Sequence, residues 1–110
     1  MQIKSKSKKP YPEMDQYIIT AHDYTDAGAW ERRMKVRPAH LEGAKKLKEN
    51  GNFIMGGAFL NEKDQMIGSV MIMQFETDAE LEAWKQNEPY ITKKIWESFT
   101  IKPFKVASVV

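Results

Sequence analysis

The 110-residue sequence contains no cysteine and no long apolar run. Without cysteine, the chain has no disulfide framework, no thiolate metal ligand and no thiol nucleophile. No apolar stretch approaches the ~20 residues that a membrane-spanning helix requires. The charged N-terminus is not followed by an apolar segment, so it does not resemble a secretory signal. We therefore expect a cytoplasmic protein without a membrane partner.

The chain also has little excess of positive over negative charge. The chain has 17 basic and 15 acidic residues, for a net charge of +2. Residues 1–15 contain four lysines and two acidic residues, which account for this whole excess. We predict a flexible basic N-terminal arm over residues 1–15 and one folded domain over residues 16–110. The arm either contacts nucleic acid or an acidic partner, or is a solvated tail. We favour the tail and expect no nucleic-acid partner, because the rest of the chain lacks a basic face.

The pattern of apolar residues predicts four strands joined by two helical connections and a turn. The strands are expected over residues 16–23, 53–60, 66–75 and 98–106. The second helix begins at a capping box, in which Thr77 is followed three residues later by Glu80. It ends before Pro89, because a residue that precedes proline is pushed toward an extended conformation.

The first helical connection covers residues 26–51 and carries its own start and stop signals. Thr25 or Asp26 is the expected N-cap, and a glycine follows the last apolar position. Pro38 lies within this stretch and disfavours helical backbone at Arg37. We therefore predict a break or kink near Arg37, and two helical pieces rather than one straight helix.

The resulting order of elements predicts an α+β fold of the ferredoxin-like βαββαβ type. In this fold a four-stranded antiparallel sheet carries both helices on one face. The second and third strands have apolar side chains on both faces, since Val70 and Ile72 alternate with Met71 and Met73. The helices of one chain cover only one face, and a large wet apolar sheet would aggregate. We therefore predict a homodimer that closes through the open sheet face. Pro103 in the last strand indicates a sheet edge or a bulge.

Five short motifs, taken in order, resemble those of the YciI-like family over residues 16–107. They are the segments 31–41 (ERRMKVRPAHL), 56–58 (GGA), 67–70 (IGSV), 87–90 (NEPY) and 101–104 (IKPF). The resemblance implies a dimeric α+β barrel, and a site in which a helix histidine pairs with a carboxylate just before a Pro-Tyr pair. Matched by position, these residues are His40 and Glu88. The family commonly has aspartate at the second position, so Glu88 keeps the carboxylate and lengthens its reach by one carbon.

A pair formed by His40 and Glu88 suits general acid–base catalysis. A carboxylate on one ring nitrogen fixes the tautomer and leaves the other nitrogen to move a proton. A related dehydrochlorinase acting on a chlorinated hydroxyquinol implies that the fold supports proton-transfer elimination. Our leading hypothesis is an enzyme that performs elimination or isomerisation on a small anionic or aromatic molecule, without a cofactor. The alternatives are a histidine that merely satisfies a buried polar atom, and a non-catalytic ligand-binding or accessory barrel.

Four further residues are candidates for substrate binding: Arg37, Ser69, His22 and Gly57. Arg37 lies close to His40 along the helix and is either a contact for an anionic ligand or a surface charge. We expect Arg33, one turn earlier, to lie on a solvated face and to pair with a nearby glutamate. Ser69 interrupts an apolar strand, where it either hydrogen-bonds a ligand or is simply tolerated.

His22 and Asp23 end the first strand, where they either line the mouth of the barrel or act as turn residues. We favour the turn. Gly57 and the preceding Gly56 either leave room for a ligand or form a β-bulge, and we favour the bulge. The two histidines of the chain are separated by seventeen residues. This spacing matches no zinc site, so we predict no metal centre.

Overall fold

Four strands and three helices follow the predicted order in the computed structural model, which describes residues 14–109. They are β1 (Asp15–Asp23), α2 (Ala29–Glu49), β2 (Phe53–Leu60), β3 (Met66–Phe75), α3 (Asp78–Asn87), α4 (Pro89–Thr92) and β4 (Trp96–Phe104). The predicted basic arm lies outside the described residues apart from Met14 and Asp15, and Asp15 already belongs to β1.

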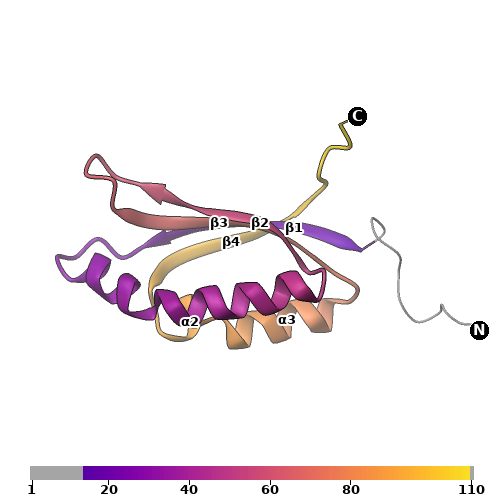
Figure 1. Ribbon diagram of the computed structural model, residues 1–110, viewed down its shortest axis with the longest axis horizontal. Helices are drawn as coiled ribbons and strands as arrows, with labels where there is room; N and C mark the ends of the chain where they lie inside the picture. The colour runs from indigo at the N-terminus through magenta and orange to yellow at the C-terminus, as the bar shows by residue number, and fades with distance from the viewer. Residues whose placement is uncertain (1–13, 110) are drawn as a thin grey trace, which may run out of the picture.

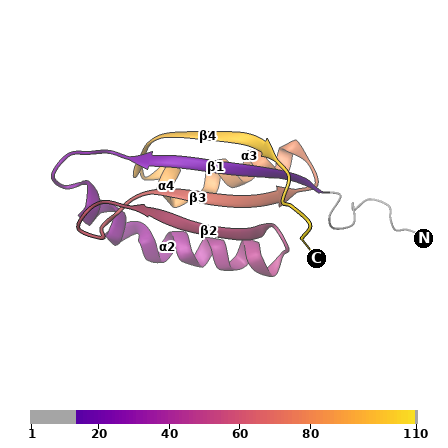
Figure 2. The ribbon, with the colours of Figure 1, turned by 90° about the horizontal axis from the view of Figure 1, so that it is seen from above.

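The four strands form one antiparallel sheet in the order β2-β3-β1-β4. The helices lie beneath the same face of this sheet (Figure 1). Seen from above, α2 runs along the β2 edge, and α3 lies further across the sheet (Figure 2). The arrangement confirms the predicted α+β, ferredoxin-like topology. It also places β4, the strand that contains Pro103, at the opposite edge.

The core lies between the helices and the covered face of the two central strands. Alternate residues of β1 and β3 point into it, and Ile19, Met71 and Met73 are almost fully buried. Burial of each of these side chains contributes roughly 1.5–3 kcal/mol. Because side chains alternate along a strand, two polar residues of β1 and β3, Asp23 and Ser69, also face the helices.

Helix α2 continues through Pro38, so the predicted break near Arg37 is wrong. A proline removes one backbone hydrogen bond and costs about 3 kcal/mol inside a helix. Here Pro38 is exposed, so water can bind the carbonyl that has lost its amide partner. Side chains on either side of the proline, Arg33 and His40, are both bonded to other elements and hold the two halves of the helix in place.

The start of α2 also differs from the prediction, because its N-cap is Gly28, which has no side chain to offer. Asp26 instead holds the turn before the helix. Its carboxylate accepts hydrogen bonds from the Gly28 amide at 3.2 Å and from the Arg32 guanidinium at 2.7 Å. The Arg32 hydrogen bonds lower the pKa of Asp26 to about 2. At α3 the predicted cap is present, since the Thr77 hydroxyl accepts from the Glu80 amide at 3.2 Å.

The predicted β-bulge at Gly56 and Gly57 is wrong. The two glycines pair in regular register with Met71 and Val70 of β3, and the register shifts lie nearer the two ends of β2. Gly56 is required for space instead, because a Cβ at this position would lie 2.9 Å from the ring of Phe53 and 3.1 Å from the carbonyl oxygen of Val70.

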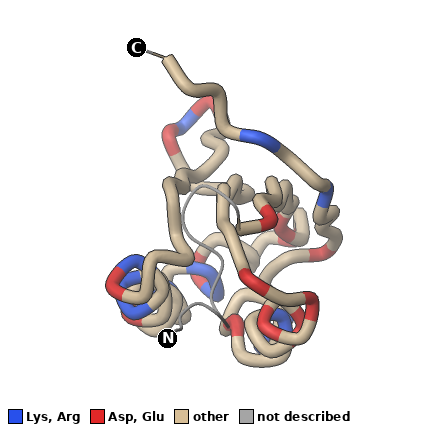
Figure 3. Tube along the Cα trace, turned by 90° about the vertical axis from the view of Figure 1, so that its right-hand side faces the viewer, with Lys and Arg blue, Asp and Glu red and all other residues tan. Residues whose placement is uncertain are grey.

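The sheet face turned away from the helices, here called the open face, carries a patch of apolar side chains. Ile18 of β1 and Ile72 of β3 are directly paired within it. Met55, Phe59 and Phe104 are 58%, 38% and 39% exposed. Charged positions gather along the helices, and the turn between β2 and β3 and the last strand also carry some (Figure 3). Lys102 of β4 pairs with Ile18, so one lysine lies on the open face. Within residues 14–109, no helix is long and apolar enough to cross a membrane.

The close packing of β1 on β3 can be tested at Gly68. We expect Gly68→Ala to destabilise the fold by roughly 1–3 kcal/mol, because a Cβ there would lie 2.5 Å from the carbonyl oxygen of Ala21. Gly43→Ala in α2 is the matched control. Its Cβ would meet nothing within 4 Å, and alanine should stabilise the helix by about 0.5–1 kcal/mol. Urea denaturation measures both changes, and a Gly68→Ala protein as stable as the parent would contradict the close strand approach.

Candidate active site

A cavity of about 320 Å³ lies between α2 and the half of the sheet formed by β2 and β3. We call it the α2 cavity. The residues that give it chemical character are Arg33, Arg37, His40, Gly57, Ser69 and Tyr90. Four of these are predicted site residues. A fifth predicted residue, Glu88, lies directly behind His40, so the structure brings five of the six predicted residues together.

His40 and Glu88 are in direct contact. The Nδ1 atom of His40 lies 2.7 Å from Oε2 of Glu88, and the two side chains are 12% and 3% exposed. The same carboxylate oxygen accepts a hydrogen bond from the backbone amide of Tyr90 at 3.0 Å, so Glu88 is also the N-cap of α4. With Nδ1 directed at the carboxylate, the second ring nitrogen, Nε2, is left for the cavity that His40 lines.

The ring of Tyr90 lies flat against the imidazole of His40. Their centroids are 4.0 Å apart, and their planes differ by 14°. The guanidinium carbon of Arg33 lies 4.5 Å from the centroid of the Tyr90 ring. Tyr90 is fully buried, and this burial raises the pKa of its phenol. Stacking and the Glu88 hydrogen bond together fix the plane of the imidazole.

Arg33 lies inside the protein, so the predicted solvated face is wrong. Its side chain is 3% exposed, and Nη1 donates to both carboxylate oxygens of Asp23, at 2.9 and 3.0 Å. Nη2 donates to the Ser69 hydroxyl at 2.7 Å, and this hydroxyl also accepts from Trp96 Nε1 at 3.3 Å. Asp23 is a buried strand residue rather than the predicted turn residue. Burial raises the pKa of Asp23, and Arg33 acts in the opposite direction.

One signal in the sequence pointed to Arg33. It precedes His40 by seven residues, which places both on the same face of a continuous helix. Because we predicted a break near Arg37, we did not expect Arg33 and His40 to share one helix face. Arg37 lies between them on the helix and lines the cavity, and it forms no ion pair with any residue of the described part of the chain. Its charge is therefore available to an anionic ligand.

The last two predicted site residues differ in position. His22 lies on the open face, where its ring stacks on Phe59 with centroids 5.6 Å apart, and so it does not reach the α2 cavity. Gly57 lines the cavity only through its backbone, because it pairs with Val70 and an added Cβ would lie on the open face, where it meets nothing within 4 Å. Among residues 14–109, no three histidine, aspartate or glutamate side chains gather into a group that could hold a metal ion.

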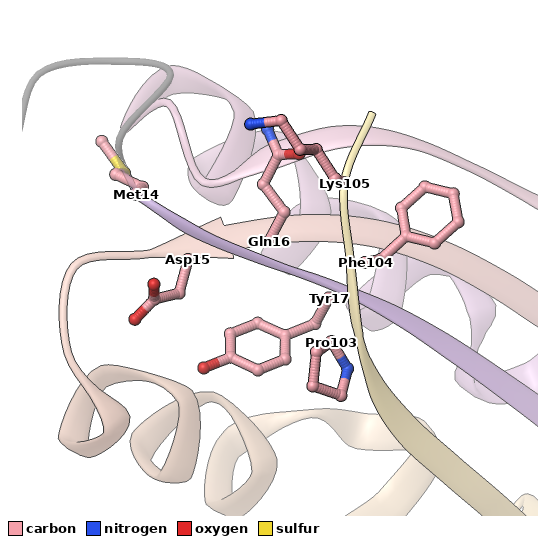
Figure 4. Close-up of a pocket in the computed structure, with 7 residues that line it drawn as sticks. All are labelled: Met14, Asp15, Gln16, Tyr17, Pro103, Phe104 and Lys105. Atoms are coloured by element: carbon pink, nitrogen blue, oxygen red, sulfur yellow. The ribbon is translucent and has the colours of Figure 1, made fainter. Parts of the chain in front are cut away.

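A second hollow, of about 570 Å³, lies where β1 begins and β4 ends (Figure 4). Tyr17 of β1 and Pro103 of β4 line it, and the Tyr17 hydroxyl lies 3.5 Å from Asp78. None of the described residues around it belongs to the His40–Glu88 pair. Because the His40–Glu88 pair lies at the α2 cavity, that cavity is the candidate site.

A family model described as the YCII-related domain matches residues 16–105. The chain belongs to this family. Protein YciI of Escherichia coli O6:H1 (strain CFT073) is 33% identical over 95 residues, which cover 81% of this chain and 95% of that protein. The family match confirms the resemblance of the sequence motifs, and it spans both His40 and Glu88.

Solved structures share the fold of this family member. TftG, a 5-chloro-2-hydroxyhydroquinone dehydrochlorinase from Burkholderia phenoliruptrix AC1100, was solved with 2,5-dihydroxybenzoquinone. It is 23% identical with a TM-score of 0.70, covering 84% of this chain and 95% of that one. A dimeric ferredoxin-like protein from an uncultured marine organism is 11% identical with a TM-score of 0.53, covering 89% and 93%. Because both proteins are less than 25% identical to this chain, their likeness to it establishes a shared fold only.

The buried ion pair provides a test of how the site is held. We expect Arg33→Gln to destabilise the protein by roughly 3–5 kcal/mol, because it leaves the buried Asp23 carboxylate without its counter-charge. Arg32→Gln is the matched control, since the Arg32–Asp26 pair is exposed and should change stability little. Urea denaturation compares the two variants.

The same Arg33→Gln variant makes a prediction about pH. Burial holds the pKa of Asp23 above its ordinary value, and loss of Arg33 removes the influence that opposes this shift. The folded variant then binds a proton more tightly than the unfolded chain, so its stability should fall as the pH rises through the raised pKa. Equal destabilisation of Arg33→Gln at acidic and neutral pH would contradict a buried, uncompensated carboxylate.

Proposed function

We propose that the α2 cavity is the active site of an enzyme that moves a proton on a small anionic or aromatic molecule, in an elimination or an isomerisation. The observation that carries this proposal is the 2.7 Å contact between His40 and Glu88, made at the wall of the cavity. An imidazole held between a buried carboxylate and a ligand cavity is equipped for general acid–base catalysis.

The proposed reaction uses the two nitrogens of His40 differently. Glu88 accepts a hydrogen bond from Nδ1–H, which leaves the lone pair of Nε2 for the ligand. Nε2 removes a proton from a ligand carbon, and the Glu88 carboxylate stabilises the imidazolium that forms. The electron pair of the broken C–H bond then expels a leaving group from the neighbouring carbon, which completes an elimination. In an isomerisation, a double bond shifts and the imidazolium returns the proton to another carbon.

The lining of the cavity supports an anionic and planar ligand. The guanidinium of Arg37 can pair with a negative charge on the ligand. The ring of Phe53 and the side chain of Leu41 offer apolar surface to a flat molecule. TftG, which shares the fold, was solved with 2,5-dihydroxybenzoquinone, a planar compound with acidic hydroxyl groups. That compound is therefore a suitable probe for this chain.

Exchange of the ring hydrogens of this quinone with solvent deuterium measures proton transfer at carbon directly. We expect the parent protein to accelerate this exchange in D2O, as followed by loss of the ring-proton signal in NMR spectra. His40→Gln should slow the protein-catalysed exchange by about 10²–10⁴-fold. Glu88→Gln should slow it as well, because an amide carries no charge to stabilise the imidazolium. Arg32→Gln, at an exposed position that does not line the cavity, should exchange like the parent.

A separate titration of quinone binding distinguishes the enzyme from the alternative of an accessory barrel. A parent protein that binds the quinone without accelerating exchange would be a ligand-binding protein, and the catalytic proposal would be lost. Equal exchange rates in the parent and in His40→Gln would show that His40 is not the base.

We also propose that the chain forms a homodimer through its open face. The support is the apolar patch around the paired residues Ile18 and Ile72, together with the exposed side chains of Met55 and Phe59. A dimeric protein of the same fold offers a precedent. Pairing two such patches would remove apolar surface from water at roughly 25 cal/mol for each Å² buried.

The dimer proposal is tested by placing a charge within the patch. We expect the parent to have twice the 12.8 kDa mass of one chain in size-exclusion chromatography with light scattering. Ile72→Lys should shift the protein to the monomer mass while leaving its circular dichroism spectrum unchanged. Glu42→Lys, on an exposed part of α2, is the control and should remain dimeric. A monomeric parent, or a fully dimeric Ile72→Lys, would exclude this interface.

A further inference from the structure

Three buried side-chain atoms in residues 14–109 have no hydrogen-bond partner: Arg33 Nε, Trp84 Nε1 and Tyr90 Oη. A buried polar atom left without a partner costs about 1–3 kcal/mol, so such atoms are rare unless water or a ligand satisfies them. Two of the three, on Arg33 and Tyr90, belong to residues that line the α2 cavity. The unpartnered donors are thus concentrated where the proposed function places a ligand.

Tyr90 is held on every side except at its hydroxyl. Its backbone amide donates to Glu88 at 3.0 Å, and its ring packs against His40 and beneath the Arg33 guanidinium. Arg33 is itself fixed by Asp23 and Ser69. A phenylalanine would make the same ring contacts without the cost of burying a hydroxyl, so packing alone does not explain a tyrosine here.

We propose that the Tyr90 hydroxyl donates a hydrogen bond to an oxygen of the ligand in the α2 cavity, and that Arg33 is the positioning residue for its ring. This inference rests on the proposed function and narrows its substrate class. The ligand carries a carbonyl oxygen conjugated to the carbon from which His40 removes the proton, and this oxygen becomes an enolate oxygen.

The charge and protonation of the pair agree with this role. Because burial raises the pKa of the Tyr90 phenol, the hydroxyl stays protonated near neutral pH and acts as a donor. The Arg33 guanidinium, paired with Asp23, lies 4.5 Å from the ring centroid and holds the ring in place. A fixed, protonated hydroxyl favours an oxygen that is negative or becomes so.

The chemical consequence follows from the stacking of Tyr90 on His40. When His40 Nε2 takes a proton from the ligand carbon, the C–H electron pair moves toward the conjugated oxygen, which gains negative charge. A donor already held in place stabilises this charge without reorganisation, and removing one such donor typically costs about 10²–10³-fold in rate. Tyr90 and His40 would therefore act on neighbouring atoms of one ligand, as oxygen donor and carbon base.

The substitution Tyr90→Phe removes only the unpartnered hydroxyl. We expect it to weaken binding of 2,5-dihydroxybenzoquinone and of benzoate by about 10-fold or more, and to slow the deuterium exchange of the quinone. Binding of toluene, an oxygen-free aromatic, should stay the same. The temperature midpoint of unfolding should be unchanged or higher, because a buried unpartnered group is lost. Tyr17→Phe, in the hollow at the other end of β1, is the matched control for all of these measurements.

The outcomes separate this inference from the function on which it rests. If the parent binds the quinone and Tyr90→Phe binds it equally well, the hydroxyl is not a ligand contact and the inference is wrong, while the proposed function stands. If Tyr90→Phe lowers the unfolding midpoint, the hydroxyl has a structural partner and the inference is again overturned. If the parent binds neither the quinone nor benzoate, the proposed ligand class fails and this inference fails with it.

Discussion

The guanidinium of Arg33 is a full positive charge in a part of the protein that almost no water reaches. Asp23 at the end of β1 pairs with this charge through both carboxylate oxygens, and the hydroxyl of Ser69 in β3 accepts a further hydrogen bond. One side chain therefore joins α2 to both central strands of the sheet. Removing a charge from water is costly, and the partners of the two Nη atoms offset this cost. The orientation of α2 on the sheet, and so the position of Arg37 and His40 above the cavity, depends on it.

The candidate site also couples a helix cap to the contact between His40 and Glu88. A single oxygen of Glu88 accepts from the amide that starts α4 and contacts the imidazole of His40. The backbone thereby fixes the carboxylate, and the carboxylate fixes the imidazole. The ring that packs on the imidazole belongs to Tyr90, the residue whose amide makes the cap. One short turn supplies the carboxylate that contacts His40, the ring that stacks on His40 and the start of α4. A substitution in this turn would therefore affect the fold and the candidate site together.

The elements that periodicity predicted best were β2 and β3, whose bounds match the prediction, because alternation along a strand is a local property. Prediction failed where distant packing decided the outcome. Pro38 is tolerated because bonds from Arg33 and His40 to other elements hold the helix around it. The local rules used to predict the effect of a proline do not include such tertiary contacts. Burial of Arg33 depends on partners in two separate strands.

The candidate site was predictable only in part. Composition offered two histidines, and the family resemblance, rather than any spacing, paired His40 with Glu88 across 48 positions. The contributions of Asp23 and Tyr90 left no sequence signal of their own. A strand-end aspartate is normally a turn residue, and an aromatic after proline is normally a core residue.

Two adjacent glycines in β2 belong to opposite faces of the sheet. Gly56 pairs with the buried Met71, and any side chain there would press on the Phe53 ring and the backbone of β3. Gly57 pairs with Val70, so an added carbon would lie on the open face, where it meets nothing within 4 Å. A substitution at position 57 therefore changes the open face while the buried ion pair, the capped turn and the strand register remain as they are. The outer surface of this strand and the lining of the cavity behind it are, in this architecture, separately adjustable traits.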